Sequence, residues 1–78
     1  MKTRTQLSRI IASNVKTLRL QRNWSCSGLA ESAGLSFRMI YKIENAEVIP
    51  RLWSMYQIAC ALGVTVDVLM GDEREGDT

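Results

Sequence analysis

Apolar residues recur every three or four positions along most of this 78-residue chain, a spacing that is typical of one face of an α-helix. The first run predicts a helix from about Leu7 to Arg22, with Leu7, Ile11, Val15 and Leu18 on its buried face. Four shorter runs predict helices over residues 26–32, 37–45, 51–62 and 66–70. No segment alternates polar and apolar residues for long enough to predict a strand. The pattern therefore predicts an all-α fold, a compact bundle of five helices.

Residues that favour helix ends lie between these runs. Ser25, Ser36 and Thr65 can each cap the start of a helix with a side-chain oxygen. Pro50 suits the start of the fourth helix, because a backbone N–H would have no partner there. The residues that can end a helix are Asn23, Gly63 and Gly71. In the fourth helix we expect these residues to point inward: Leu52, Met55, Ile58, Ala59 and Leu62.

The stretch from Cys26 to Asn45 indicates two short helices joined by a tight turn. Gly34 lies where the chain must turn sharply, and a residue without Cβ suits that position. Ala30 is small enough to let the two helices cross closely. The expected inner face consists of Leu29, Ala30, Ala33, Leu35, Ile40 and Ile43. This is the pattern of a helix-turn-helix, whose second helix enters the major groove of DNA.

The net charge of +2 is distributed unevenly along the chain. Residues 1–71 carry nine Lys and Arg against four acidic residues, so this part is basic, as a phosphate-binding surface requires. Residues 72–78 carry four acidic residues and one Arg, and we expect this tail to be disordered. We therefore expect one helix-turn-helix domain over residues 1–71, followed by the acidic tail. A plain soluble surface is the alternative explanation for the charges.

The composition argues against several classes of protein. The chain has no histidine, and its two cysteines, Cys26 and Cys60, lack the spacing of a metal site. It shows no phosphate loop and no thiol beside an activating base, so we expect no enzyme activity, no cofactor and no small-molecule ligand. No apolar run approaches the roughly 18 residues of a membrane span, and no signal peptide is visible. We therefore expect a cytoplasmic protein with reduced thiols.

The chain resembles the phage-repressor-like helix-turn-helix family, of the Cro-repressor and xenobiotic-response-element type, over roughly residues 8–70. The matching stretches are VKTLR at 15–19, SCSGLAESAGLS at 25–36, MIYKIEN at 39–45 and IACALGVTVDVLM at 58–70. Two positions depart from the family's pattern. Cys26 stands where the family usually has a glutamine that helps to bind a backbone phosphate, and Ala46 stands where it usually has a glycine. The first departure affects one phosphate contact and not the fold.

The resemblance implies that the third helix reads DNA bases. Phe37, Arg38 and Lys42 occupy the positions that face base edges in the family. Arg and Lys can bind the acceptors of guanine, and Phe can pack on a thymine methyl group. Tyr41 is better placed for a phosphate or for packing on a neighbouring base step. A solvated helix face is the alternative interpretation.

Other residues are expected to contact the DNA backbone. Ser25 and Ser27 present hydroxyl groups at the start of the second helix, where backbone N–H groups also favour phosphate. For Ser25, simple capping is an equal alternative. Asn45 resembles the family's phosphate-binding position at the end of the third helix. Arg51 begins the next helix and is expected beside the same DNA strand.

The family also joins an Arg late in the first helix to a Glu near the end of the third, here Arg19 and Glu44. Such a pair would hold the recognition helix at a fixed angle, and two independent surface charges are the alternative. Trp24 stands where the family has an apolar residue that closes the core, so we expect it to pack there.

These features favour a sequence-specific DNA-binding transcriptional regulator that acts as a homodimer on a palindromic operator, such as a phage repressor or a controller of restriction–modification genes. A dimer is expected because one helix reads only a few base pairs. Trp53 and Tyr56, with Cys60 on the same flank, lie beside the inward face of the fourth helix, and Val64 and Val66 follow. We expect the dimer surface there, although Trp53 could instead be partly buried. The alternative function is a protein-interaction module such as an antitoxin.

Overall fold

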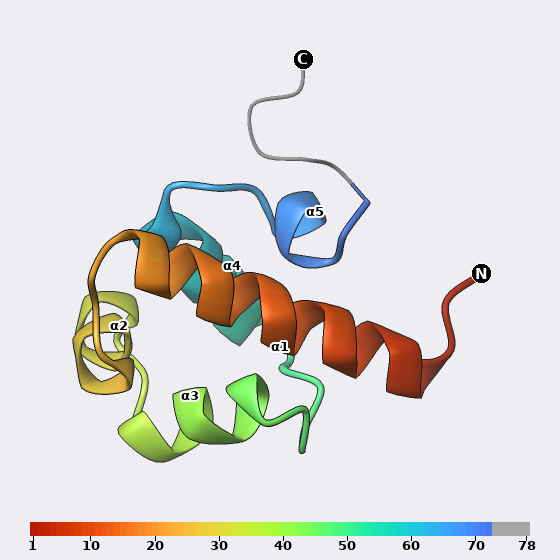
Figure 1. Cartoon of the computed structure of the whole chain (residues 1–78), viewed down its shortest axis with the longest axis horizontal. Coiled ribbons are helices and arrows are strands. Elements are labelled where there is room, and N and C mark those ends of the chain that lie inside the picture. Colours follow the sequence, from red (N-terminus) through yellow and green to blue (C-terminus); the bar gives the residue numbers. More distant parts are fainter. Residues whose placement is uncertain (73–78) are drawn as a thin grey trace.

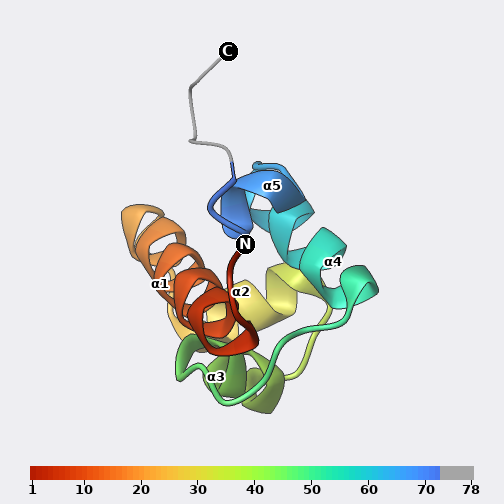
Figure 2. The ribbon, with the colours of Figure 1, turned by 90° about the vertical axis from the view of Figure 1, so that its right-hand side faces the viewer.

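The computed structural model describes residues 1–72 and contains, within them, five α-helices and no strand. Their bounds are α1 Arg4–Gln21, α2 Cys26–Ala33, α3 Phe37–Glu44, α4 Leu52–Leu62 and α5 Val66–Leu69. The long α1 crosses the whole molecule (Figure 1). Figure 2 shows α3 at one end and α5 at the other, with α1 and α4 on opposite sides between them. The predicted all-α fold of five helices is therefore confirmed.

The core forms where α1, α2, α3, α4 and α5 meet, and each helix contributes apolar side chains to it. The largest fully buried side chains are Ile11, Val15, Leu29, Ile40, Ile43, Ile58, Leu62 and Leu69. On α1, α3 and α4 they recur three or four residues apart, which is the spacing of one helix face. Leu7 and Leu35, which the pattern places inward, are half-buried and pack against this core.

The first helix begins earlier than predicted, at Arg4 instead of Leu7. The reason is a capping box. The Thr3 hydroxyl accepts a hydrogen bond from the backbone N–H of Gln6, and the Gln6 side chain accepts one from the backbone N–H of Thr3. The helix ends at Gln21, and Asn23 takes the left-handed conformation (φ 59°) that the sequence indicated.

The third and fifth helices each end one residue earlier than predicted, because Asn45 and Met70 are their C-terminal caps.

The fourth helix corrects two predictions. Pro50 does not occupy the first helical position, because Arg51 is the N-terminal cap and Leu52 is the first helical residue. Leu52 does not point inward: it is 76% exposed, and Ser54 and Met55 are the buried residues of that turn. At 3.6 residues per turn, a buried face centred on these two residues leaves Leu52 on its flank.

Polar side chains of α1 and of its C-terminal cap residue bond to the C-terminal carbonyl groups of α4 and α5. The Asn14 amide donates to the carbonyl oxygens of Val68 and Leu69 at 3.2 and 3.1 Å. The Arg22 guanidinium donates to the carbonyl oxygen of Leu62. Because the last carbonyls of a helix have no partner within it, these bonds fix α4 and α5 against α1.

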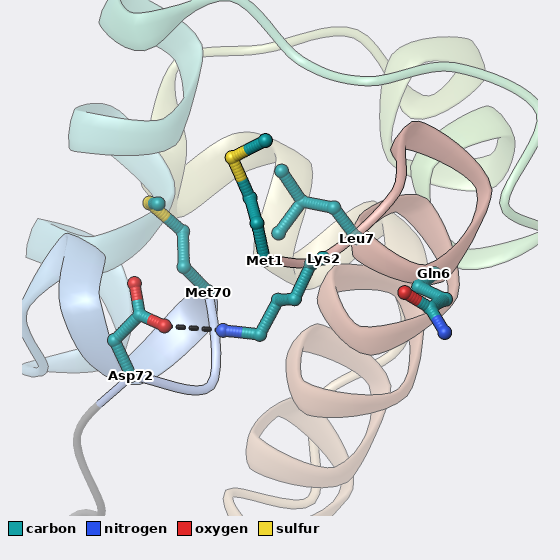
Figure 3. A pocket seen from close by; sticks show the side chains of 6 residues that line it. All are labelled: Met1, Lys2, Gln6, Leu7, Met70 and Asp72. Atoms are coloured by element: carbon teal, nitrogen blue, oxygen red, sulfur yellow. Dashed lines mark hydrogen bonds and ion pairs between the residues drawn. The ribbon is translucent and has the colours of Figure 1, made fainter.

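The two ends of the described chain meet beside α5. Figure 3 shows the Lys2 ammonium paired with the Asp72 carboxylate at the rim of an open cleft. The other residues that line the cleft are Met1, Gln6, Leu7 and Met70. Of the acidic tail, only Asp72 is described, so the expectation of disorder lies outside the described residues. No helix within residues 1–72 is long and apolar enough to cross a membrane.

Candidate nucleic-acid interface

The helix-turn-helix is formed by α2, the turn at Gly34 and α3. Gly34 has a φ of 71°, in the left-handed region that favours glycine. The backbone N–H of Leu35 bonds to the carbonyl oxygen of Ala30 and closes the turn. Ser36 then caps α3, its hydroxyl accepting from the backbone N–H of Met39 at 3.1 Å. These local bonds define the start of α3.

An ion pair joins the end of α3 to α1. The Arg19 guanidinium donates through Nε and Nη2 to the two carboxylate oxygens of Glu44, at 2.7 and 2.9 Å. Its Nη1 donates to the carbonyl oxygen of Trp24 at 2.7 Å. The two side chains are only 9% and 7% exposed. The hydrogen bond with Glu44 raises the pKa of Arg19 despite the opposing cost of burial, so this guanidinium stays charged.

The outward face of α3 carries the residues that the sequence assigned to base reading. Phe37 and Arg38 are exposed, and Lys42 is half-buried. Neither Arg38 nor Lys42 has an ion-pair partner among residues 1–72, whereas Arg19 does. Phe37 and Tyr41, one turn apart, stack on each other with ring centroids 6.1 Å apart. This face therefore offers two unpaired cations and two aromatic rings.

The predicted backbone contacts lie at helix ends. The Ser25 hydroxyl accepts a hydrogen bond from the backbone N–H of Gly28 at 3.0 Å, so its capping role is present in the structure. Ser27 is exposed in the first turn of α2. Asn45 is exposed at the end of α3, and Arg51 is exposed at the start of α4. Whether any of them contacts a phosphate stays a prediction.

Cys26 connects the start of α2 with the ion pair. Its thiol donates a weak hydrogen bond to Glu44 Oε1, with sulfur and oxygen 3.7 Å apart. Burial, together with the nearby Glu44 charge, raises the pKa of the thiol. The sequence showed Cys26 only as a departure from the family's glutamine. The contact could not be read from it, because Cys26 and Glu44 are 18 positions apart.

Trp24 is half-buried and packs against the core, as the resemblance implied. The Arg22 guanidinium lies 5.4 Å from the centre of its ring, a cation–π contact that covers part of the remaining ring surface.

A second surface lies on α4 and the start of α5. Leu52, Trp53, Tyr56 and Val66 line an open, mainly apolar cleft of about 570 Å³, and we refer to these four residues as the α4–α5 patch. Trp53 is 63% exposed, so most of its surface faces solvent. Trp53 and Tyr56 stack, with ring centroids 5.8 Å apart.

Two residues differ from the expected composition of this surface. Leu52 belongs to the α4–α5 patch, although the sequence pattern placed it inside. Its position four residues before Tyr56 was the available signal, since residues four apart share a helix face. Val64, a candidate for the dimer surface, is half-buried against the core and does not line the cleft. Cys60 is exposed beside Tyr56, and a hydrogen bond between the two raises the pKa of the Tyr56 hydroxyl.

Metal binding has no candidate residues in the described part of the chain. Within residues 1–72, no group of three or more Cys, Asp and Glu side chains could hold a metal ion.

Comparison with known proteins agrees with this geometry. Residues 15–69 match the helix-turn-helix family model HTH_3. Over 58 residues the chain is 41% identical to the HTH-type transcriptional regulator SutR of Escherichia coli (strain K12). The match includes 74% of this chain and 33% of SutR, so the chain spans about a third of the length of that relative.

Two solved structures share the fold. The first is the hypothetical transcription factor NHTF from Neisseria, with a TM-score of 0.80, 26% identity, and coverage of 90% of this chain and 80% of that one. The second is an HTH_3 family transcriptional regulator from Vibrio cholerae, with a TM-score of 0.83, 26% identity, and coverage of 94% and 41%. The chain described here belongs to the HTH_3 helix-turn-helix family.

Proposed function

We propose that this chain is a sequence-specific DNA-binding transcriptional regulator that places α3 in the major groove. The observation that carries the proposal is which cations of the chain have an acidic partner and which have none. Arg38 and Lys42 extend from the outward face of α3 without an acidic partner among residues 1–72. By contrast, the buried Arg19 of α1 is neutralised by Glu44. Unpaired cations on a firmly held helix are available for base edges and phosphates.

The contacts divide into two kinds. Arg38 and Lys42 bind base edges, because Arg can bond two acceptors of guanine and Lys can bond the same edge less rigidly. Arg51, Ser27 and Asn45 bind backbone phosphates, which fix the register of the protein on the duplex. Ser25 and the hydroxyl of Tyr41 add to this second group.

The regulator acts as a homodimer on a palindromic operator. One recognition helix reads only a few base pairs, whereas a two-fold dimer reads two half-sites about 34 Å apart. The α4–α5 patch supports this part of the proposal, because Leu52, Trp53 and Tyr56 are all more than half exposed. Figure 2 shows α3 and α4 on different sides of the molecule, so a partner on α4 leaves the recognition helix free.

The proposal is tested by selecting bound duplexes from a random pool with the unmodified chain. A palindromic sequence should emerge, with half-sites one helical turn apart. If the selected duplexes share no sequence, the chain is not a specific regulator.

A protein-interaction module is the second candidate, because the α4–α5 patch could equally receive a different protein. A strictly monomeric chain that shows no preference for any duplex would favour it. The free cations on α3 favour DNA, since a module without DNA has no need of them there.

A further inference from the structure

The outward face of α3 carries an apolar ridge beside its charged groups. Phe37 and Tyr41 are four residues apart, so they lie one above the other on the helix. Their rings are 6.1 Å apart and inclined by 28°, which makes them a stacked pair. Each ring limits the rotation of the other, so the two present one surface, which we call the aromatic ridge.

The fold does not need the aromatic ridge. The inner side of α3 is filled by Ile40 and Ile43, which are fully buried. Phe37 and Tyr41 keep 53% and 52% of their surface exposed. Leaving that much aromatic surface in water forgoes the free energy that burial would provide. A partner that covers the ridge recovers this free energy.

The chemistry of that partner follows from the neighbouring row of side chains. Arg38 and Lys42 each follow one ring in the sequence and form a parallel row on the same helix. Both lack an ion-pair partner within residues 1–72. The partner must therefore offer apolar groups beside negative charge or hydrogen-bond acceptors. In the major groove of DNA, the apolar group on the base edges is the 5-methyl group of thymine, and it lies beside the acceptors of the other bases.

The spacing of the rings agrees with this partner. Successive bases along one strand are about 3.4 Å apart, so a separation of 6.1 Å corresponds to about two base steps. Two rings at this spacing can each meet a methyl group on neighbouring or next-neighbouring bases of one half-site.

We infer that Phe37 and Tyr41 act together as the reader of thymine methyl groups, packing their rings against one or two thymines in each half-site. This inference rests on the proposed function and adds the base that the aromatic ridge selects. It assigns the ring of Tyr41 to the bases, while its hydroxyl group at the rim stays free for a phosphate.

The test replaces single thymines of the selected operator by deoxyuridine, which removes only the methyl group, and measures affinity by fluorescence anisotropy. At one or two positions per half-site, the loss should be about fourfold for each methyl group, as expected for one buried methyl. At all other thymines the affinity should be unchanged.

Variants connect that loss to the two rings. In Phe37→Ala, and separately in Tyr41→Ala, sensitivity to deoxyuridine should disappear at the affected positions. Tyr41→Phe keeps the ring and should keep the sensitivity, even if loss of the hydroxyl weakens binding to every sequence. Arg38→Ala, in the neighbouring row, should lower affinity and leave the sensitivity intact. Both aromatic residues are exposed, so urea unfolding should show all four variants to be folded.

The outcomes separate this inference from the proposed function. If the chain prefers its operator but no thymine responds to deoxyuridine, or the operator contains no thymine in its half-sites, the inference is overturned and the regulator remains. If Phe37→Ala and Tyr41→Ala keep the sensitivity, other residues read the methyl groups and the inference is again wrong. If the unmodified chain prefers no duplex at all, both proposals fail.

Discussion

Arg19 and Glu44 join the first helix to the end of the recognition helix through two parallel hydrogen bonds, with both side chains less than 10% exposed. A third N–H group of the same guanidinium donates a hydrogen bond to the carbonyl oxygen of Trp24. Because a planar guanidinium matches a carboxylate in one geometry, the pair fixes direction as well as distance. We therefore expect this contact to help set the angle at which α3 leaves the protein.

Removal of Glu44 should destabilise the fold strongly. Glu44→Ala leaves a buried, charged Arg19 without its partner, and we expect the free energy of unfolding in urea to fall by about 3–5 kcal/mol. A double-mutant cycle with Arg19→Ala should show large coupling, because the second change removes the uncompensated charge. Coupling near zero would mean that the two charges are independent.

Base contacts and phosphate contacts should differ in their response to sequence and salt. Arg38→Ala should cost about 1–3 kcal/mol per half-site and relax the preference at one base pair, and Lys42→Ala should act at a nearby one. Arg51→Ala should weaken binding to all sequences alike and reduce the slope of log affinity against log salt by about one. The measurement is binding of each variant to single-base variants of the operator at several salt concentrations. A uniform loss for Arg38→Ala and Lys42→Ala would contradict base reading by these residues.

Assembly should depend on the α4–α5 patch. Sedimentation at micromolar concentration should give a mass near twice the 8.8 kDa of one chain. Trp53→Asp or Val66→Asp should shift the chain towards the monomer, because a carboxylate would lose its water in an apolar contact. Ser27→Asp, on α2, is the matched control and should leave the mass unchanged. A monomer at all concentrations, even with operator present, rules out the homodimer.

Ala46 should be a site of backbone strain. Its φ of 58° lies in the left-handed region, where a side chain costs about 1–2 kcal/mol. Ala46→Gly should therefore raise the free energy of unfolding by about 0.5–1 kcal/mol, after the greater freedom of glycine in the unfolded chain is deducted. Gly34→Ala, at a φ of 71°, should have the opposite sign. Urea unfolding of both variants gives the comparison, and a loss of stability in Ala46→Gly would contradict the strain.

The two thiols should react at different rates. Cys60 is exposed, whereas burial raises the pKa of Cys26, so less of its reactive thiolate is present at pH 8. Maleimide should label one thiol quickly and one slowly, and Cys60→Ser should remove the fast phase. Because the folded pKa of Cys26 is the higher one, its contribution to stability is fully present below the unfolded pKa of about 8.5 and falls as pH rises above it. Equal rates in the folded protein would contradict this assignment.

The sequence determined those parts of the molecule that depend on near neighbours. Helical spacing of apolar residues, together with the capping residues between the runs, located the five helices of the described residues, because a helix buries one face and repeats every 3.6 residues. Gly34 and Ser36 marked the turn and the start of the recognition helix, because both act within a few residues of themselves. The Thr3–Gln6 capping box was equally local and was readable as Thr-x-x-Gln, although the prediction began the helix later.

Only the tertiary structure decided what lies on the surface and which distant groups meet. It placed Leu52 beside Trp53 and Val66, because the direction of the buried face of α4 is set by the helices that pack on it. It brought Cys26 to Glu44 and Asn14 to the carbonyls of α5, which are contacts across 18 to 55 positions. Such contacts depend on how helices are oriented in space. A one-dimensional pattern of apolar residues gives the approximate position of a buried face, but neither its exact direction nor the residues that it contacts.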